Sequence, residues 1–183
     1  MKSIGKFVSV ALVAAFTVSS PAQASPKGWQ TASDIGVYSL MAVSIGLPLV
    51  ERDTNGALQA AGSIGAASLI ATGLKETFPK TRPDGSDRKS FPSGHTSNAF
   101  AAAASLAERQ GLAVGIPALA VAGFVGLARV EGKKHYWSDV AVGAGIGSLA
   151  GLLITRKHPD VRQSALYPWG DTKSAGFTYA TRF

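Results

Sequence analysis

Four long apolar segments constrain the fold of this chain more than any other feature of its sequence. Two of them, Ala57 to Leu74 and Gly111 to Ala128, are 18 residues long and contain no charged side chain. As a helix, each would measure about 27 Å, against about 30 Å for the hydrocarbon core of a bilayer. The other two, Ile35 to Val50 and Val140 to Thr155, are shorter. No strand-like alternation occurs before the tail, so the sequence predicts helices packed in or beside a membrane.

Turns and capping residues divide the body of the chain into five expected helices. Ser33 and Asp34 are typical N-cap residues, and we expect them to begin a first helix that ends near Val50. The other expected helices run from Ala57 to about Thr77, from the Pro92-Ser93-Gly94-His95 corner to Gln110, from Gly111 to about Arg129, and from about Trp137 to about Thr155. The predicted fold class is all-α, a compact bundle of about five to six helices.

Length and composition fit one domain that is rich in small and apolar residues. The 183 residues suffice for one core but not for two. Hydrophobic residues make up 46% of the chain and charged residues 16%, with 21 glycines. Gly143, Gly147 and Gly151 lie four residues apart, which predicts a flat helix face for close packing. Cysteine is absent, which excludes disulfides and a cysteine nucleophile.

The formal net charge of +7 suits an anionic substrate or anionic lipid head groups. Nucleic acid is the other usual partner of a basic chain. We do not expect it here, because no run of Lys or Arg exceeds two residues and no aromatic ladder accompanies them.

The first 24 residues have the pattern of a signal peptide. Lys2 and Lys6 precede an apolar run from Phe7 to Val18, and a small-x-small cleavage pattern ends at Ala24. An uncleaved first transmembrane helix is the alternative, disfavoured because the run is shorter than the ~20 residues that a span needs. We therefore expect export from a bacterial cytoplasm, a helical domain at 25–157 and a tail at 158–183.

Lys75 and Arg82 place two cations at the end of the second expected helix and in the loop after it. Arg82, which precedes Pro83, offers a fork that matches phosphate oxygens, and Lys75 adds a second positive charge. Alone, a lysine at a helix C-terminus is more often a response to the helix dipole.

The corner at Ser93, Gly94 and His95 predicts an anion cradle at the start of the third helix. Gly94 lets the backbone approach a ligand, and the helix N-terminus offers free N–H groups, with the Ser93 hydroxyl as a further donor. The imidazole of His95 is placed to donate a proton to a leaving oxygen. Alone, such a corner is more often a turn and a cap.

Arg129, His135 and Asp139 form a third constellation. His135 and Asp139 lie four residues apart at a helix start and are expected to share a face. The carboxylate can then hold one ring nitrogen while the other acts as a nucleophile, and Arg129 can bind the same phosphate. Alone, this charged stretch would be interpreted as a solvated loop.

Together the three constellations resemble the signature motifs of the PAP2 superfamily, which contains type 2 phosphatidic acid phosphatases, bacterial nonspecific acid phosphatases and vanadium haloperoxidases. Ten specified positions match in order, in Lys75-x6-Arg82-Pro83, Pro92-Ser93-Gly94-His95 and Arg129-x5-His135-x3-Asp139. The resemblance covers about Ala57 to Thr155. Ala128 departs from it where the family usually has serine, which removes a hydroxyl but no charge.

The resemblance implies a helical bundle with its active site at the helix ends on one side. It implies that His135 attacks phosphorus and forms a phosphohistidine, that Asp139 orients His135, and that His95 protonates the leaving oxygen and then activates water. The implied phosphate-binding residues are Lys75, Arg82, Ser93, Gly94 and Arg129. Three cations would do the work of a metal, so we expect no cofactor, activity in EDTA and inhibition by vanadate.

Several substrates and locations stay open. The favoured substrate is a phosphorylated lipid such as phosphatidic acid, phosphatidylglycerol phosphate or undecaprenyl diphosphate, hydrolysed in the inner membrane from its periplasmic side. A soluble periplasmic nonspecific acid phosphatase is the alternative, because an exported helical domain would also bring the motifs together. The short chain disfavours a vanadium-dependent haloperoxidase, and the complete set of catalytic positions disfavours a noncatalytic envelope protein.

The remaining candidates carry less weight. Tyr136 and Trp137 flank His135, and packing is their default role, beside a pocket or a membrane interface. His158 follows the last helix and is interpreted as a surface residue. The alternation from Gly176 to Phe183 resembles the terminal strand of a barrel, but one strand cannot form a barrel, so a loosely docked or flexible tail is preferred.

Overall fold

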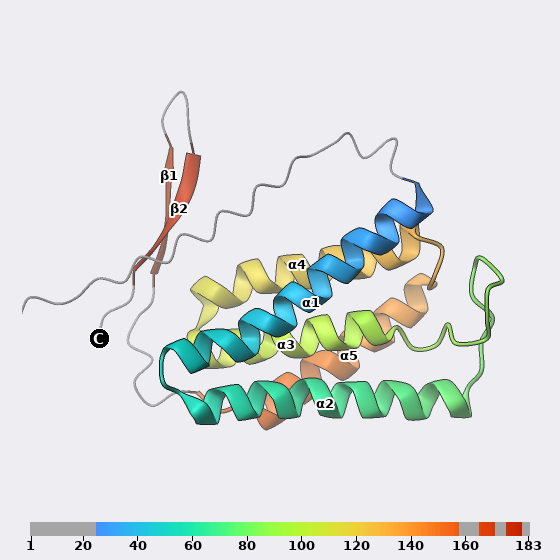
Figure 1. The fold of residues 1–183 in the computed structure, drawn as a ribbon, viewed down its shortest axis with the longest axis horizontal. Coiled ribbons are helices and arrows are strands. Elements are labelled where there is room, and N and C mark those ends of the chain that lie inside the picture. The colour runs from blue at the N-terminus through green and yellow to red at the C-terminus, as the bar shows by residue number, and fades with distance from the viewer. Residues whose placement is uncertain (1–24, 158–164, 171–174, 181–183) are drawn as a thin grey trace, which may run out of the picture.

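The computed structural model describes residues 25–157, 165–170 and 175–180, and five helices make up most of them (Figure 1). They are α1 (Pro26–Val50), α2 (Thr54–Thr77), α3 (Gly94–Gln110), α4 (Leu112–Glu131) and α5 (Trp137–Ile154). The bundle confirms the predicted all-α class, and α2 to α5 begin and end within three residues of the expected bounds. The expected signal peptide lies outside the described residues.

The start of α1 corrects the prediction, because the helix begins at Pro26 and not near Ser33. Ser25 is the N-cap, and its hydroxyl oxygen accepts a hydrogen bond from the Gly28 N–H at 3.1 Å. Proline is favoured at the first helical position, where an N–H has no partner to lose. Ser33 and Asp34 therefore lie about two turns inside the helix, and their side chains are available for tertiary contacts.

The central helix of the bundle is α3, which packs against each of the other four helices. In Figure 1 it runs between α1 and α2. Its middle is a run of alanines, Ala101 to Ala104, none more than 5% exposed. Small side chains let neighbouring backbones approach on every side, so this composition is what a fully surrounded helix requires.

Three glycines of α5, Gly143, Gly147 and Gly151, form what we call the glycine seam against α3. A Cβ at Gly143 would lie 2.6 Å from the carbonyl oxygen of Ser93, and one at Gly151 would lie 2.5 Å from the Cβ of Ala104. Real Cβ atoms cannot approach other atoms so closely. The seam confirms the flat helix face predicted from the spacing of the glycines.

We expect Gly147→Ala to destabilise the fold, because its methyl group would overlap the backbone carbonyl of Ser97. Overpacking of this kind costs about 1–3 kcal/mol. Gly145→Ala is the matched control, since nothing lies within 4 Å of a Cβ there. It should gain about 0.5–1 kcal/mol from helix propensity. Thermal unfolding in detergent compares the two, and equal melting temperatures would show that the seam is not tight.

The five helices alternate in direction along the chain. One end of the bundle therefore collects the starts of α1, α3 and α5 and the ends of α2 and α4 (Figure 1). The connecting loops 78–93 and 132–136 lie there as well. The regions from Lys75 to His95 and from Arg129 to Asp139, which contain all three motifs, thus lie at the same end of the bundle, and we call it the site end.

A buried ion pair closes the opposite end of the bundle. Nε and Nη2 of Arg109 on α3 each lie 2.5 Å from a carboxylate oxygen of Asp53, and neither side chain is more than 9% exposed. Nη1 of the same arginine donates to the Arg156 carbonyl oxygen at 2.8 Å. Bidentate pairs of this kind fix geometry well. The pair ties the α1–α2 turn to the ends of α3 and α5.

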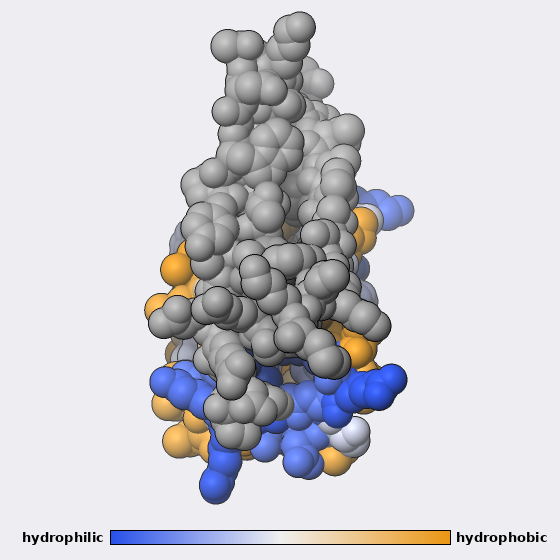
Figure 2. All heavy atoms as spheres, turned by 90° about the vertical axis from the view of Figure 1, so that its left-hand side faces the viewer, coloured by the Kyte–Doolittle hydropathy of each residue, from blue (hydrophilic) through white to orange (hydrophobic). Residues whose placement is uncertain are grey.

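The flanks of the bundle are apolar. Leu69 on α2 and Leu153 on α5 are more than three-quarters exposed, at 76% and 78%. Figure 2 views the end opposite the site and shows hydrophilic residues gathered there, with hydrophobic ones along both sides. By length and composition, α1, α2, α4 and α5 are able to cross a membrane. Apolar flanks between polar ends are typical of a bundle embedded in a bilayer.

Beyond the helices, β1 (Ala165–Gly170) and β2 (Ala175–Ala180) pair as an antiparallel hairpin. The period-two alternation that the sequence shows after Gly176 thus belongs to a paired strand. Its partner strand, β1, was not predicted from the sequence. His158 lies outside the described residues.

Candidate active site

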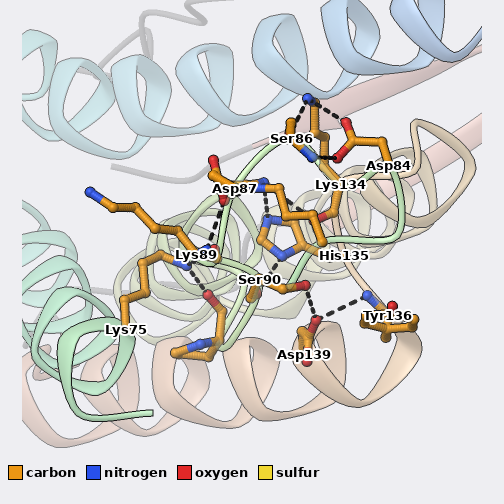
Figure 3. Close-up of polar contacts among 12 residues, drawn as sticks. Lys75, Asp84, Ser86, Asp87, Lys89, Ser90, Lys134, His135, Tyr136 and Asp139 are labelled. Atoms are coloured by element: carbon orange, nitrogen blue, oxygen red, sulfur yellow. Dashed lines mark hydrogen bonds and ion pairs between the residues drawn. The ribbon is translucent and has the colours of Figure 1, made fainter. Parts of the chain in front are cut away.

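The motif residues meet at the site end, although they come from separate segments. Lys75 and Arg129 lie in the last turns of α2 and α4. Arg82 and His135 lie in the two loops, and His95 is the second residue of α3. The alternation of helix direction alone brings these helix ends together. Figure 3 shows the polar contacts that link the two loops to α2 and α5.

His135 is the most enclosed histidine of the site, with 2% of its surface exposed. Its Nδ1 donates to the Ser90 carbonyl oxygen at 2.6 Å (Figure 3), and its Nε2 lies 3.5 Å from Nη1 of Arg82. Burial, followed by the charge of Arg129, lowers the pKa of His135 to about 3. The ring is therefore neutral near pH 7, with a lone pair on Nε2 that can attack an electrophile.

Asp139 contacts His135 through Ser90, which corrects the expected direct hydrogen bond. One carboxylate oxygen accepts from the Ser90 hydroxyl at 2.6 Å and from the Tyr136 N–H at 3.0 Å (Figure 3). The other accepts from the Lys80 ammonium at 2.7 Å. Asp139 is the third residue of α5 and closes a capping box with Tyr136, which turns the carboxylate toward the helix start. Ser90 then joins Asp139 to the ring.

His95 faces α1. Its Nε2 lies 2.8 Å from Oδ1 of Asp34, and the ring of Tyr38 lies edge-on to it with 6.5 Å between centroids. Burial, followed by the positive charge of Arg129, lowers the pKa of His95, while the charge of Asp34 opposes this shift. The balance between these charges decides whether the ring holds the proton that general acid catalysis needs.

Arg129 carries an unsatisfied donor into the site. Its side chain is 9% exposed, and Nη1 donates to the Ser33 hydroxyl at 3.2 Å and lies 3.5 Å from Asp34. Nε has no hydrogen-bond partner, and no other side-chain nitrogen or oxygen buried among the described residues is in this state. A buried unpaired donor costs about 1–3 kcal/mol. Such a donor is expected where a ligand supplies the acceptor.

The start of α3 supplies backbone donors. The Ser93 hydroxyl is fully buried, bonds the Thr96 hydroxyl at 2.9 Å and accepts from the Thr96 N–H at 3.4 Å, so it caps the helix instead of facing a ligand. The N–H groups of Gly94 and His95 begin the helix and have no intrahelical acceptor. The Ser93 N–H donates to the Asp139 carbonyl oxygen at 3.0 Å, which joins the first turns of α3 and α5.

Lys75 lies beside this helix start. Its Cε is 3.9 Å from the position that a Cβ on Gly94 would take. The ammonium donates to the carbonyl oxygen of Pro92 and, at 3.1 Å, to that of Lys89. A Cβ at position 94 would thus be in ordinary van der Waals contact with Lys75, so the lysine side chain packs directly beside the first turn of α3.

Two ion pairs hold the loop that carries Arg82. Nε of Arg82 lies 2.6 Å from the Asp87 carboxylate. The Lys134 ammonium lies 2.6 Å from Asp84, which ties this loop to the one that carries His135 (Figure 3). Gly85 turns the loop at φ +69°, a conformation that glycine adopts without strain. The loop thus places Arg82 against the nucleophile.

The positive charges act on both imidazoles. Arg82 and Arg129 lower the pKa of His95 and also that of His135, and Lys75 acts on His135 as well. In the described part of the chain, no group of three or more His, Asp or Glu residues is arranged to hold a metal ion. Three cations around a neutral nucleophile suit a tetrahedral oxyanion.

Sequence reasoning missed three residues of this site. Ser90 and Lys80 act through the fold of the loop, which no spacing rule describes. Asp34 lies 61 positions before His95, and sequence analysis treated it as a helix cap. The sequence nevertheless contained an indication of its role, because a charged residue beside a long apolar stretch is a candidate for a functional site.

The profile of the PAP2 superfamily matches residues 56–163. The chain therefore belongs to the PAP2 superfamily, as the three motifs predicted. The matched region contains all eight site residues that the sequence predicted. Asp34 lies outside it.

Two solved structures share the fold. The crystal structure of Aquifex aeolicus LpxE aligns with a TM-score of 0.62 and 22% identity, over 74% of this chain and 87% of that chain. The first transmembrane PAP2-type phosphatidylglycerolphosphate phosphatase from Bacillus subtilis aligns with a TM-score of 0.57 and 24% identity, over 75% and 77%. The likeness to both concerns the helical fold.

One curated relative is similar in sequence. The lipid A 1-phosphatase of Porphyromonas gingivalis is 39% identical over 82 residues. The match covers 43% of this chain and 18% of the relative, so the chain corresponds to less than a fifth of the relative's length.

Proposed function

We propose that this protein is a metal-independent phosphatase that removes phosphate from a lipid phosphomonoester or diphosphate through a phosphohistidine on His135. One observation carries the proposal: a neutral, buried imidazole directs Nε2 toward Arg82, in the same positive site where Arg129 keeps an unpaired donor. A tetrahedral phosphate satisfies that donor and presents phosphorus to the nucleophile. Membership of the PAP2 superfamily supports the reaction class.

In the first step, Nε2 of His135 attacks phosphorus. The proton stays on Nδ1, which donates to the Ser90 carbonyl oxygen, and the Asp139 carboxylate that accepts from the Ser90 hydroxyl stabilises the positive charge that develops on the ring. The bond between phosphorus and the leaving oxygen breaks as His95 donates a proton to that oxygen. Guanidinium and ammonium groups stabilise the charge that builds on the phosphoryl oxygens.

In the second step, water hydrolyses the phosphohistidine. His95, now neutral, takes a proton from the water as its oxygen bonds to phosphorus. The bond from phosphorus to Nε2 of His135 breaks, and inorganic phosphate leaves. Both histidines return to their starting states, so the cycle needs no metal and no redox partner.

The apolar flanks support a lipid substrate in the inner membrane, with the site end facing the periplasm. Tyr136 and Trp137 at this end are 43% and 61% exposed, which suits residues at a membrane interface. Phosphatidic acid, phosphatidylglycerol phosphate, undecaprenyl diphosphate and a lipid A 1-phosphate are the candidate substrates. They share a phosphate on an apolar anchor.

The purified protein in detergent should release phosphate from at least one of these lipids in excess EDTA, and vanadate should inhibit it. Vanadate adopts the five-coordinate geometry of the phosphoryl group in transfer, so it should bind tighter than phosphate by about 10²-fold or more. Malachite-green phosphate release measures both effects. A strict requirement for a divalent metal would contradict the mechanism.

A membrane fractionation separates the lipid phosphatase from the soluble alternative. Retention in the membrane until detergent is added supports the lipid enzyme. Release by osmotic shock, with small phosphate esters hydrolysed faster than lipids, would instead support a soluble acid phosphatase.

A further inference from the structure

A further carboxylate, that of Asp34, lies at the site end, outside the three motifs. Oδ1 of Asp34 on α1 is 2.8 Å from Nε2 of His95 and 3.5 Å from the Arg129 guanidinium. The neighbouring Ser33 accepts from the same guanidinium at 3.2 Å. One carboxylate oxygen therefore lies between a side chain of α3 and a side chain of α4. None of this follows from the family profile, which begins at residue 56.

We infer that Asp34 is a positioning residue of the reaction, which holds His95 as the proton donor to the leaving group and fixes Arg129 beside the phosphate. The inference rests on the proposed function. Asp34 touches neither phosphorus nor the leaving oxygen in this arrangement and acts through the two side chains that do.

The contact with Asp34 assigns the two ring nitrogens of His95. Nε2 donates to the carboxylate, and no contact within residues 25–157 occupies Nδ1. Nδ1 is therefore the ring nitrogen that is available to the substrate. As the bond between phosphorus and the leaving oxygen breaks, the imidazolium gives its Nδ1 proton to that oxygen, and the other proton stays on Nε2, which donates to the Asp34 carboxylate. In the second step Nδ1 takes a proton from the attacking water.

The charged and titratable groups around His95 come from every element at this end. They are Asp34 and Tyr38 of α1, Lys75 of α2, Arg82 of the loop 78–93, Arg129 of α4, and Asp139 of α5, which is turned to Lys80 and Ser90. Burial and the arginines disfavour the imidazolium, whereas Asp34 favours it. Removing the carboxylate lowers the pKa of His95 further, so the acid form is lost at a lower pH.

Asp34→Asn tests the inference because it removes the charge and keeps the shape. We expect kcat for phosphatidic acid in detergent micelles to fall about 10- to 100-fold, since an alkoxide needs a proton to leave. We expect kcat for p-nitrophenyl phosphate, whose leaving group needs none, to fall about threefold or less. The basic limb of the kcat profile for phosphatidic acid should move to lower pH, and Asp34→Glu should restore it.

Glu131→Gln is the matched control, an exposed carboxylate at the end of α4, and should behave as wild type. His95→Ala should show the same loss for phosphatidic acid, and the double variant should lose at most about a further threefold, the part that acts through Arg129. Equal losses on the two substrates with an unshifted pH profile would overturn the inference while leaving the phosphatase intact. A wild-type protein that hydrolyses neither substrate would overturn the proposed function and the inference together.

Discussion

His135→Ala should lose phosphatase activity by about 10³-fold or more, because no other group can take the phosphoryl group. The wild-type protein, mixed with ³²P-labelled phosphatidic acid and quenched in alkali, should carry label in an acid-labile, alkali-stable form. His135→Ala should carry none. The expectation follows from the neutral ring, whose pKa of about 3 leaves Nε2 free to attack across the physiological pH range.

Two further variants make this result specific. His135→Gln keeps a side chain that can donate to the Ser90 carbonyl oxygen, so it should fold as wild type and still be inactive. His158→Ala removes the third histidine of the chain and should keep full activity and label. Label that persists in both His135 variants would place the covalent intermediate elsewhere.

Arg129→Lys should reduce kcat/KM by about 10²-fold, although the positive charge is retained. Lysine lacks the planar fork and the Nε donor that is unpaired in this structure, and donors of this kind act mainly on the transition state. Affinity for vanadate should fall with kcat/KM, because vanadate occupies the same oxygen positions. Steady-state kinetics and vanadate titration on the detergent-solubilised protein measure both.

Arg109→Lys is the matched control for this substitution. Arg109 is also a buried arginine bound to an aspartate, but it lies at the end of the bundle opposite the site. Its replacement should lower the melting temperature and leave kcat/KM of the folded protein within about threefold of wild type. If Arg129→Lys kept both kcat/KM and vanadate affinity, the assignment of Arg129 to the phosphate would be wrong.

The fold was predictable because its signals are local. The long apolar segments predicted four of the helices, and the corner at Pro92 and the glycine at Gly111 predicted where α3 begins and ends. The spacing of Gly143, Gly147 and Gly151 predicted the seam. Helix α1 was predicted to be shorter than it is. Ser33 and Asp34 are residue types that often cap helices, but the helix begins at Pro26 with Ser25 as its N-cap.

The candidate site was predictable only in part, because motifs name residues and not contacts. The spacing of His135 and Asp139 predicted a shared face, but the capping box on Tyr136 redirects the carboxylate to Ser90. The partner of His95 lies on α1, and only the tertiary packing of α1 on α3 brings Asp34 to it.

The glycine seam has a mechanical consequence. Because α5 has no side chain at these three positions, its backbone lies directly against α3, and the first turns of the two helices share the hydrogen bond from Ser93 to Asp139. Two helices in such contact move together as one rigid body, because a close-packed interface leaves no free volume in which one helix could slide along the other. Bilayer thickening or thinning would therefore tilt the outer helices while the turns that flank the two histidines keep their spacing.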